Sequence, residues 1–269
     1  MRYLQPLSAV YLYDEPDAAG LDVERIAGFL ASMLPKVQVV PRTDYYTHQF
    51  TRFSVDLRAQ LEREMVRQLQ AARIPDSTPA QDGPRVRGAA TDAEDTSLIF
   101  DAPSYQSILR LLTDEPEARS DSLHVIFTNN GLASRPAPGE KPGLHIICMG
   151  VPSIISLSGL VEALPRPREY EFRRAQLAMI GASEQDLEDL AEQFADRTFG
   201  YGDARINELC MGYSLMACVY RMTGEAFCPD PDCRLHAARD QQQLIELHCS
   251  TDTGLCDRHQ ETLRTAAQD

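Results

Sequence analysis

The sequence predicts an α/β fold, in which a mixed sheet with flanking helices is followed by a small C-terminal zinc-binding subdomain. Short β-branched and aromatic runs alternate with longer segments of helical periodicity, the pattern of α/β proteins. The chain has 269 residues with 43% hydrophobic content, enough for a substantial core. Residues 225–269 hold four of the seven cysteines and three of the six histidines. We therefore expect an α/β domain over residues 1–224 and a helical zinc-binding subdomain over residues 225–269.

The first part of the chain predicts two strands and two helices. Residues 9–13 and 37–40 are short apolar runs of strand-forming residues. Residues 21–34 and 53–72 place apolar side chains at helical spacing among charged ones. Residues 75–95 are rich in Pro, Gly, Ala and Asp and have almost nothing to bury, so they predict a flexible loop.

The middle of the chain predicts three more strands, at residues 97–100, 123–127 and 144–149. The last of these is apolar on both faces, which is typical of a central strand covered on both sides. Between the first two lies a short helix over residues 104–112, with Ser104 as its expected N-cap.

The remainder predicts one irregular segment and three helices. Residues 150–172 are rich in Ser, Gly and Pro, yet carry apolar side chains throughout, and we interpret them as a partly buried loop. Helices follow over residues 173–180 and 184–194, the second capped by Ser183. Residues 203–222 form the strongest helical pattern and are apolar nearly all round, which predicts a buried helix. Asp203 is its expected N-cap and Gly224 its C-cap.

Charge and composition exclude several classes of partner. The formal net charge is −14 and the pI is about 4.9, so the surface repels phosphate backbones and we expect no nucleic acid partner. No signal peptide and no apolar run of membrane-spanning length is visible, which predicts a soluble, cytoplasmic protein without a membrane partner. In that reducing compartment, seven cysteines favour metal binding over disulfides. The sequence leaves the oligomeric state open.

Two short ligand pairs predict a Zn²⁺ site. They are Cys228-x4-Cys233 and Cys256-x2-His259, separated by an insert of helix length. Zinc binds thiolates and imidazoles tetrahedrally, and such sites are commonly built from two knuckles. Four protein ligands leave no open position for water, so we expect a structural zinc. His248 and Cys249 are spare ligands that could replace a member of the set.

The sequence lacks the local motif that usually marks a catalytic zinc site. The sequence contains no His-Glu-x-x-His, in which two histidines on one helix face share a metal. His124 and His145 could join a carboxylate in a site assembled from distant residues. We prefer to interpret both as ordinary strand histidines.

If the chain hydrolyses peptides, we expect the site where residues 150–170 meet the start of the helix at 203–222. Ligands of α/β proteins gather at the carboxyl ends of strands. The candidates for a general base are Glu208, Glu169 and Glu162. The candidates for substrate binding are Ser153, Ser156 and Arg168. A serine nucleophile is disfavoured because Gly-x-Ser-x-Gly is missing, and a structural ion pair between Glu208 and a loop arginine is the plainer alternative.

Three stretches carry a resemblance to a known family: GVPSIIS at residues 150–156, REY at 168–170, and FC to CRL at 227–235. With them the chain resembles domain-of-unknown-function family 6775, which is labelled metallopeptidase. The resemblance covers roughly the second half of the chain and the opening strand, and it implies zinc-dependent peptide hydrolysis. The chain departs from the family's pattern at Arg239, where a histidine is expected, and at Leu164, where a proline is expected.

Two functions therefore stay open. The first is a zinc-binding protein that hydrolyses peptides without a His-Glu-x-x-His motif. The alternative is a non-catalytic module that zinc stabilises and that binds a peptide or a protein.

Overall fold

The computed structural model describes residues 4–74, 98–114, 116–135, 142–250 and 253–266. The loop predicted over residues 75–95 lies outside them. No helix in these ranges is both long enough and apolar enough to cross a membrane.

The main sheet is mixed, as predicted. Its strand order is β2-β1-β4-β8-β7, with β1, β2, β4 and β8 parallel and β7 antiparallel to β8. A smaller sheet has the order β3-β5-β6. The strands of the main sheet are β1 (Ala9–Tyr13), β2 (Gln38–Arg42), β4 (Ser122–Thr128), β7 (Ile147–Cys148) and β8 (Ser153–Ser156). Those of the smaller sheet are β3 (Ile99–Asp101), β5 (Gly131–Ala133) and β6 (Leu144–His145).

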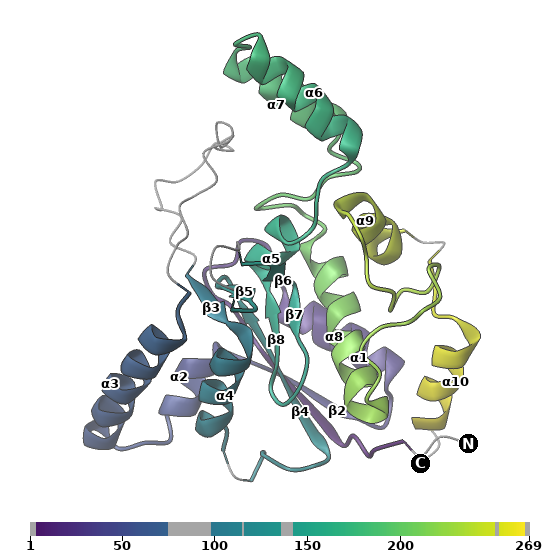
Figure 1. Ribbon diagram of the computed structural model, residues 1–269. Helices are drawn as coiled ribbons and strands as arrows, with labels where there is room; N and C mark the ends of the chain where they lie inside the picture. Colours follow the sequence, from purple (N-terminus) through teal and green to yellow (C-terminus); the bar gives the residue numbers. More distant parts are fainter. Residues whose placement is uncertain (1–3, 75–97, 115, 136–141, 251–252, 267–269) are drawn as a thin grey trace.

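Helices cover both faces of the main sheet (Figure 1). Helices α1 (Val23–Met33) and α8 (Ile206–Thr223) pack on one face, and α2 (Tyr45–Phe50), α3 (Val55–Ala72) and α4 (Ala102–Leu112) lie on the other. Alternation along the strands builds both cores: Leu123, Val125 and Phe127 of β4 join the first, and Ile126 joins the second. The buried α8 is confirmed, with Cys210 and Cys218 fully buried in it.

Two segments differ from their predictions. Residues 144–149 are not a central strand; they divide between β6 in the smaller sheet and β7 at the edge of the main sheet. The central strand is β4, which is buried along its whole length. Residues 150–172 are not a loop either, because they contain β8, α5 (Leu157–Glu162) and the start of α6 (Arg168–Met179).

The prediction of a loop over residues 150–172 was wrong because it rested on the serine-rich composition of this segment, and its serines have backbone partners. The Ser153 hydroxyl donates to the Gly150 carbonyl at 2.9 Å, and the Ser156 hydroxyl donates to the Asn130 carbonyl at 2.7 Å. A hydroxyl that is hydrogen-bonded to backbone can be buried in a strand at little cost. Ser156 also caps α5 by accepting from the Gly159 amide.

Helix ends follow the predicted chemistry with two corrections. Ser183 caps α7 (Glu184–Gln193) through a capping box, and Gly224 ends α8 at a φ of 74°, in the left-handed region. The N-cap of α4 is Asp101 rather than Ser104, whose amide donates to the Asp101 carboxylate. Helix α8 begins after Arg205, because the Asp203 carboxylate accepts from the Arg205 amide and closes a separate turn.

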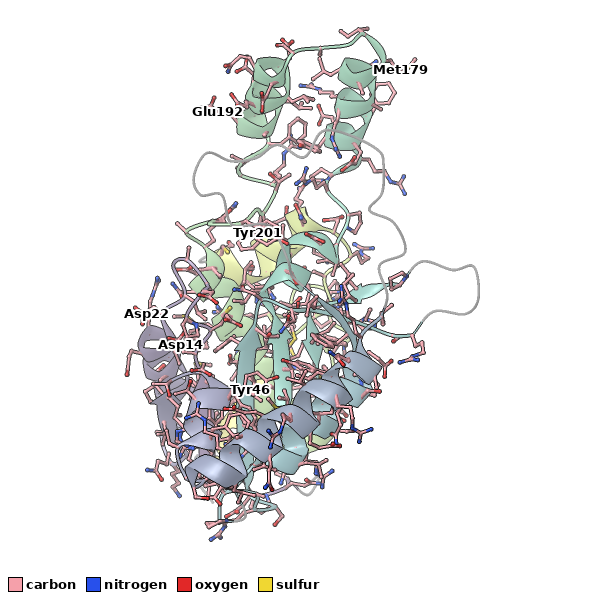
Figure 2. The ribbon with its side chains drawn as sticks, turned by 90° about the vertical axis from the view of Figure 1, so that its left-hand side faces the viewer. Asp14, Asp22, Tyr46, Met179, Glu192 and Tyr201 are labelled. Atoms are coloured by element: carbon pink, nitrogen blue, oxygen red, sulfur yellow. The ribbon has the colours of Figure 1, made fainter. Side chains whose placement is uncertain are left out.

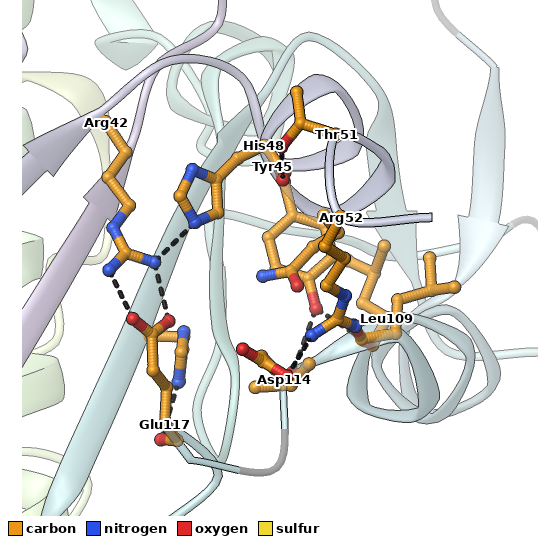
Figure 3. A network of polar contacts seen from close by, with 12 residues as sticks. Arg42, Tyr45, His48, Thr51, Arg52, Leu109, Asp114 and Glu117 are labelled. Atoms are coloured by element: carbon orange, nitrogen blue, oxygen red, sulfur yellow. Dashed lines mark hydrogen bonds and ion pairs between the residues drawn. The ribbon is translucent and has the colours of Figure 1, made fainter. Parts of the chain in front are cut away.

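A polar network holds α2 against the sheet (Figure 3). The Arg42 guanidinium donates to both Glu117 carboxylate oxygens, at 2.6 and 2.5 Å, and lies 2.7 Å from His48 Nε2. Nearby, Arg52 pairs with Asp114 at 2.6 Å. Hydrogen bonds from Arg42 lower the pKa of Glu117, so its carboxylate is held in the charged form.

The C-terminal segment contains α9 (Gln241–Cys249) and α10 (Asp257–Ala266). Side chains from this segment, among them Leu235, Leu244 and Leu263, belong to the same core cluster as α1 and α8. The predicted domain boundary at residue 224 stays a prediction.

Candidate metal centre

Four side chains converge at the C-terminal end of the fold. The ligand atoms of Cys228, Cys233, Cys256 and His259 all lie within 4.8 Å of one another. The sulfurs of Cys228 and Cys256 are 3.7 Å apart, and His259 Nδ1 lies 3.2 Å from the Cys256 sulfur and 3.5 Å from the Cys233 sulfur. An ion about 2.3 Å from each sulfur in a tetrahedron places the sulfurs about 3.8 Å apart. The four donors therefore fit the size and donor preference of Zn²⁺.

Backbone hydrogen bonds shape the first ligand pair. The Cys228 amide donates to the Leu235 carbonyl at 2.8 Å, and the Cys233 amide donates to the Asp230 carbonyl at 3.2 Å. His236 Nδ1 lies 2.8 Å from the Cys228 carbonyl oxygen, so its ring serves the backbone of this turn. His236 is not a member of the four-residue group.

The second pair is set by the start of α10. The His259 amide donates to the Cys256 carbonyl at 2.9 Å, which turns both side chains toward the first pair. In Figure 1, α10 lies beside the turn after α8, so the cluster joins segments that are distant along the chain.

The pKa values of the side chains in the cluster shift in different directions. Cys228, Cys233 and His259 are buried, and Cys256 is half-buried. Burial raises the pKa of the Cys233 thiol to about 12, whereas at Cys256 the burial effect is outweighed by hydrogen bonds and the pKa is lowered. Burial and the nearby Arg258 lower the pKa of His259, so its ring is neutral as a ligand must be. Bound Zn²⁺ replaces thiol protons, which makes occupancy pH-dependent.

The two spare ligands lie elsewhere. His248 is buried against Gly212 and the Tyr213 ring, whose centroid is 5.2 Å from its own. Cys249 is half-buried at the end of α9. Neither belongs to the four-residue group, and no other group of three or more metal-ligating side chains occurs in the described part of the chain.

The three carboxylates proposed as a general base have three different partners. Glu208 Oε1 pairs with Arg25 of α1 at 2.5 Å, so the structural ion pair exists but its partner is a helix arginine, not a loop arginine. Within the described residues, the buried Glu208 Oε2 has no hydrogen-bond partner. Glu162 accepts from the Tyr201 hydroxyl at 2.6 Å. Glu169 pairs with Arg173 at 2.8 Å on the exposed α6.

The predicted substrate-binding residues are placed differently from one another. Ser153 and Ser156 are fully buried in β8, and their hydroxyls bond backbone carbonyls, as described above. Arg168 is exposed at the start of α6. The structure thus keeps the two serines within the sheet and leaves the arginine at the surface.

A residue that the sequence did not single out, Gln241 of α9, joins the segment 150–170 to the loop before α8. The side-chain amide of Gln241 donates to the Val161 carbonyl at 2.7 Å, and its oxygen accepts from the Phe199 amide at 3.1 Å. Its own backbone amide donates to the Pro165 carbonyl. Gln241 is fully buried, and no periodicity or spacing marks it, because its partners are far away in the sequence.

His124 and His145 behave as strand histidines. His124 is fully buried, with Nδ1 2.9 Å from the Tyr13 hydroxyl and Nε2 3.1 Å from the Glu117 carbonyl oxygen. His145 is exposed on β6, and its Nε2 lies 2.8 Å from the Ser134 hydroxyl.

Arg234 connects the metal-ligand turn to the core and was also missed. It follows Cys233 directly, and its guanidinium donates to the carbonyls of Glu208 and His248, both at 3.3 Å. The guanidinium carbon lies 5.1 Å from the centre of the Phe29 ring. Burial lowers the pKa of Arg234, although the group stays charged. A basic residue next to a ligand cysteine was the only sequence signal for this role.

Comparisons with known proteins match nearly the whole chain. The model of domain-of-unknown-function family 6775, described as a probable metallopeptidase family, matches residues 6–266. No curated protein is significantly similar to the chain. A crystal structure of archaemetzincin from Methanopyrus kandleri is similar, with a TM-score of 0.46 and 13% sequence identity over 98% of this chain and 97% of that chain. A TM-score of this size describes a likeness of general outline, and no residue of this chain takes a role from it.

Proposed function

The chain belongs to the probable metallopeptidase family, and from this premise we propose that it is a zinc-binding protein whose zinc is structural. Cys228, Cys233, Cys256 and His259 are the proposed ligands. The observation that carries the proposal is their convergence within 4.8 Å. When bound, Zn²⁺ would cross-link the turn after α8 to α10 and contribute folding free energy directly.

A structural role follows from the number and kind of donors. Four side-chain ligands complete a tetrahedron, whereas a catalytic zinc keeps one position open for water. Three cysteines and one histidine are a common set for structural sites. The geometry therefore favours the alternative left open by the sequence, a zinc-stabilised module that binds a peptide or a protein.

Metal analysis of matched variants tests the zinc site. We expect one zinc per chain in the wild-type protein and in Cys249→Ser, and a loss of zinc in Cys256→Ser. Cys249 is the appropriate control because it is half-buried, lies in the same segment and is outside the four-residue group. Full zinc in Cys256→Ser, or loss of zinc in Cys249→Ser, would show that the ligand set is wrong.

Peptide hydrolysis is a second candidate function, and family membership favours it. Glu208 is the carboxylate that we propose as general base, because its Oε2 is buried and lacks a hydrogen-bond partner in the described part of the chain. A carboxylate oxygen in that position can accept a proton from a bound water.

The Glu208→Gln variant separates the two candidates. On a mixture of fluorogenic peptides, hydrolysis by wild-type protein that disappears in Glu208→Gln, with unchanged melting temperature, supports catalysis. Glu169→Gln is the control, because Glu169 lies on the exposed α6. Zinc-loaded wild-type protein with no turnover on this mixture supports the binding module.

A further inference from the structure

We propose that the zinc site is also a redox switch, in which a peroxide joins Cys228 and Cys256 in a disulfide and the metal is released. The switch rests on the proposed function, because it uses the same ligands. It adds a modification site, and the reagent is a hydroperoxide such as hydrogen peroxide. Three features of the molecule support it: the distance between two sulfurs, their unequal access to solvent and the position of the site at the surface.

The sulfurs of Cys228 and Cys256 lie close together although they belong to different ligand pairs. They are 3.7 Å apart, whereas the sulfurs of a disulfide are about 2.0 Å apart. The two atoms would therefore move about 1.7 Å closer when they bond. All seven cysteines of the chain are free in the structure, so both sulfurs are available for this reaction.

The three cysteines of the site differ in their access to solvent. Zinc ligands are thiolates, and the thiolate is the form of cysteine that reacts with peroxides, so access decides which sulfur reacts first. Cys256 is half-buried, whereas Cys228 and Cys233 are 3% and 1% exposed. We therefore expect the peroxide to oxidise Cys256, and Cys228 to attack the oxidised sulfur from within the fold. Cys233 should stay reduced.

Cys256 lies near the surface because it precedes an outer helix. Within α10, only His259 and Leu263 are buried. Leu263 packs in the core on the face of the main sheet that α1 and α8 cover, whereas α3 lies over the other face. Helix α10 is at the right-hand edge of the molecule in Figure 1, and α3 is in front in Figure 2. A small oxidant can thus reach Cys256 without any opening of the main sheet.

The oxidation takes two balanced steps. The Cys256 thiolate attacks one oxygen of hydrogen peroxide, so that an S–O bond forms, the O–O bond breaks and hydroxide leaves. The Cys228 thiolate then attacks the Cys256 sulfur, so that the S–S bond forms, the S–O bond breaks and a second hydroxide leaves. The two sulfurs lose two electrons, and the peroxide is reduced to hydroxide. A dithiol reverses the change by thiol–disulfide exchange.

The disulfide removes two of the four zinc donors. Cys233 and His259 remain, and two ligands do not complete the tetrahedral set of a structural zinc, so the metal leaves. The disulfide still connects the turn after α8 to the residue before α10. The oxidised chain therefore keeps one link between these segments, but His259 no longer holds α10 to a metal.

Zinc release and disulfide mapping on the full chain test the switch. Zinc-loaded wild-type protein is treated with hydrogen peroxide, the released metal is measured with a chromogenic chelator, and the cysteines are mapped by mass spectrometry without reduction. We expect each chain to lose its zinc and to contain a Cys228–Cys256 link. A dithiol with added zinc should restore the starting state. Dimedone traps sulfenic acids, and when it is present during the oxidation its adduct should be on Cys256.

Cys249→Ser is the matched control, because Cys249 is also half-buried, lies in the same segment and is outside the four-residue group. It should release zinc at the wild-type rate, and slower release would overturn the proposal by showing that Cys249 is the reactive thiol. Zinc-loaded protein that keeps its metal under peroxide, or that releases it without a Cys228–Cys256 link, would overturn the switch and leave the proposed zinc site intact. A dimedone adduct on Cys228 or Cys233 in place of Cys256 would do the same. Protein that purifies without zinc would instead contradict the proposed function, and the switch with it.

Discussion

Replacing His248 should make the stability of this protein less sensitive to acid. The ring is buried between α9 and α8, and neither of its nitrogens has a hydrogen-bond partner in the part of the chain that the structure describes. Burial, together with the charge of Arg234, lowers its pKa to about 3. The folded protein therefore keeps this histidine neutral at pH values where the unfolded chain protonates it.

The sign and size of the effect follow from linkage. In the unfolded chain the pKa of histidine is about 6.5, so below that pH the unfolded state binds a proton that the folded state does not. Stability is complete above pH 6.5 and is lost progressively until the folded pKa, near 3, is reached. Each pH unit in this window costs about 1.4 kcal/mol, so the loss at pH 4.5 is about 3 kcal/mol.

Urea unfolding at about pH 7.5 and about pH 4.5 measures this loss. Other groups, such as His259, also change their protonation over this range, so the informative quantity is the difference between wild type and His248→Leu. We expect the variant to lose about 3 kcal/mol less than the wild type between the two pH values. His145→Leu is the matched control, because His145 is exposed. Equal pH dependence in His248→Leu and wild type would refute the reasoning.

Three further outcomes are expected. Gly212→Ala should destabilise the protein by about 1–3 kcal/mol in urea unfolding, because its Cβ would lie 2.0 Å from His248 Nδ1; an unchanged midpoint would contradict this packing. Glu117→Gln should lower the free energy of unfolding by about 1–3 kcal/mol at neutral pH, because it removes the charged hydrogen bonds that Glu117 accepts from Arg42. The cost should be smaller in acid, where protonation of Glu117 weakens the same hydrogen bonds in the wild-type protein. Chelation of zinc should increase hydrogen exchange in α10 and in the turn after α8, while β4 stays protected. If chelation leaves hydrogen exchange in α10 and this turn unchanged, the result would argue against a structural metal.

Much of the fold could be predicted because it depends on local patterns. The strand at residues 9–13 and the helices at 21–34 and 184–194 can be recognised from the spacing of their apolar side chains and from their capping residues. Both signals depend only on residues that are close together in the sequence. The strand predicted at 144–149 failed for the opposite reason. Its apolar composition suits burial on both faces, but the register divides it between two sheets, with His145 exposed.

The candidate site divides in the same way. Cysteine and histidine spacing identified the four residues that converge, because each ligand pair is formed within one turn of chain. The partners of Glu208 could not be identified from spacing, since Arg25 is supplied by α1 and Arg234 by the turn that carries Cys233. The serines of β8 resembled an exposed binding loop until the sheet supplied carbonyl partners for them.

By itself, the sequence determined the α/β class, the buried character of α8 and the two Cys and His pairs that converge, because side-chain period and short spacings express them directly. Only the tertiary structure decided which strand is central, which residues enclose His248, and that α6 and α7 leave the body as a hairpin. These features depend on contacts between residues far apart in the chain, and such contacts leave no periodic signal in a single sequence.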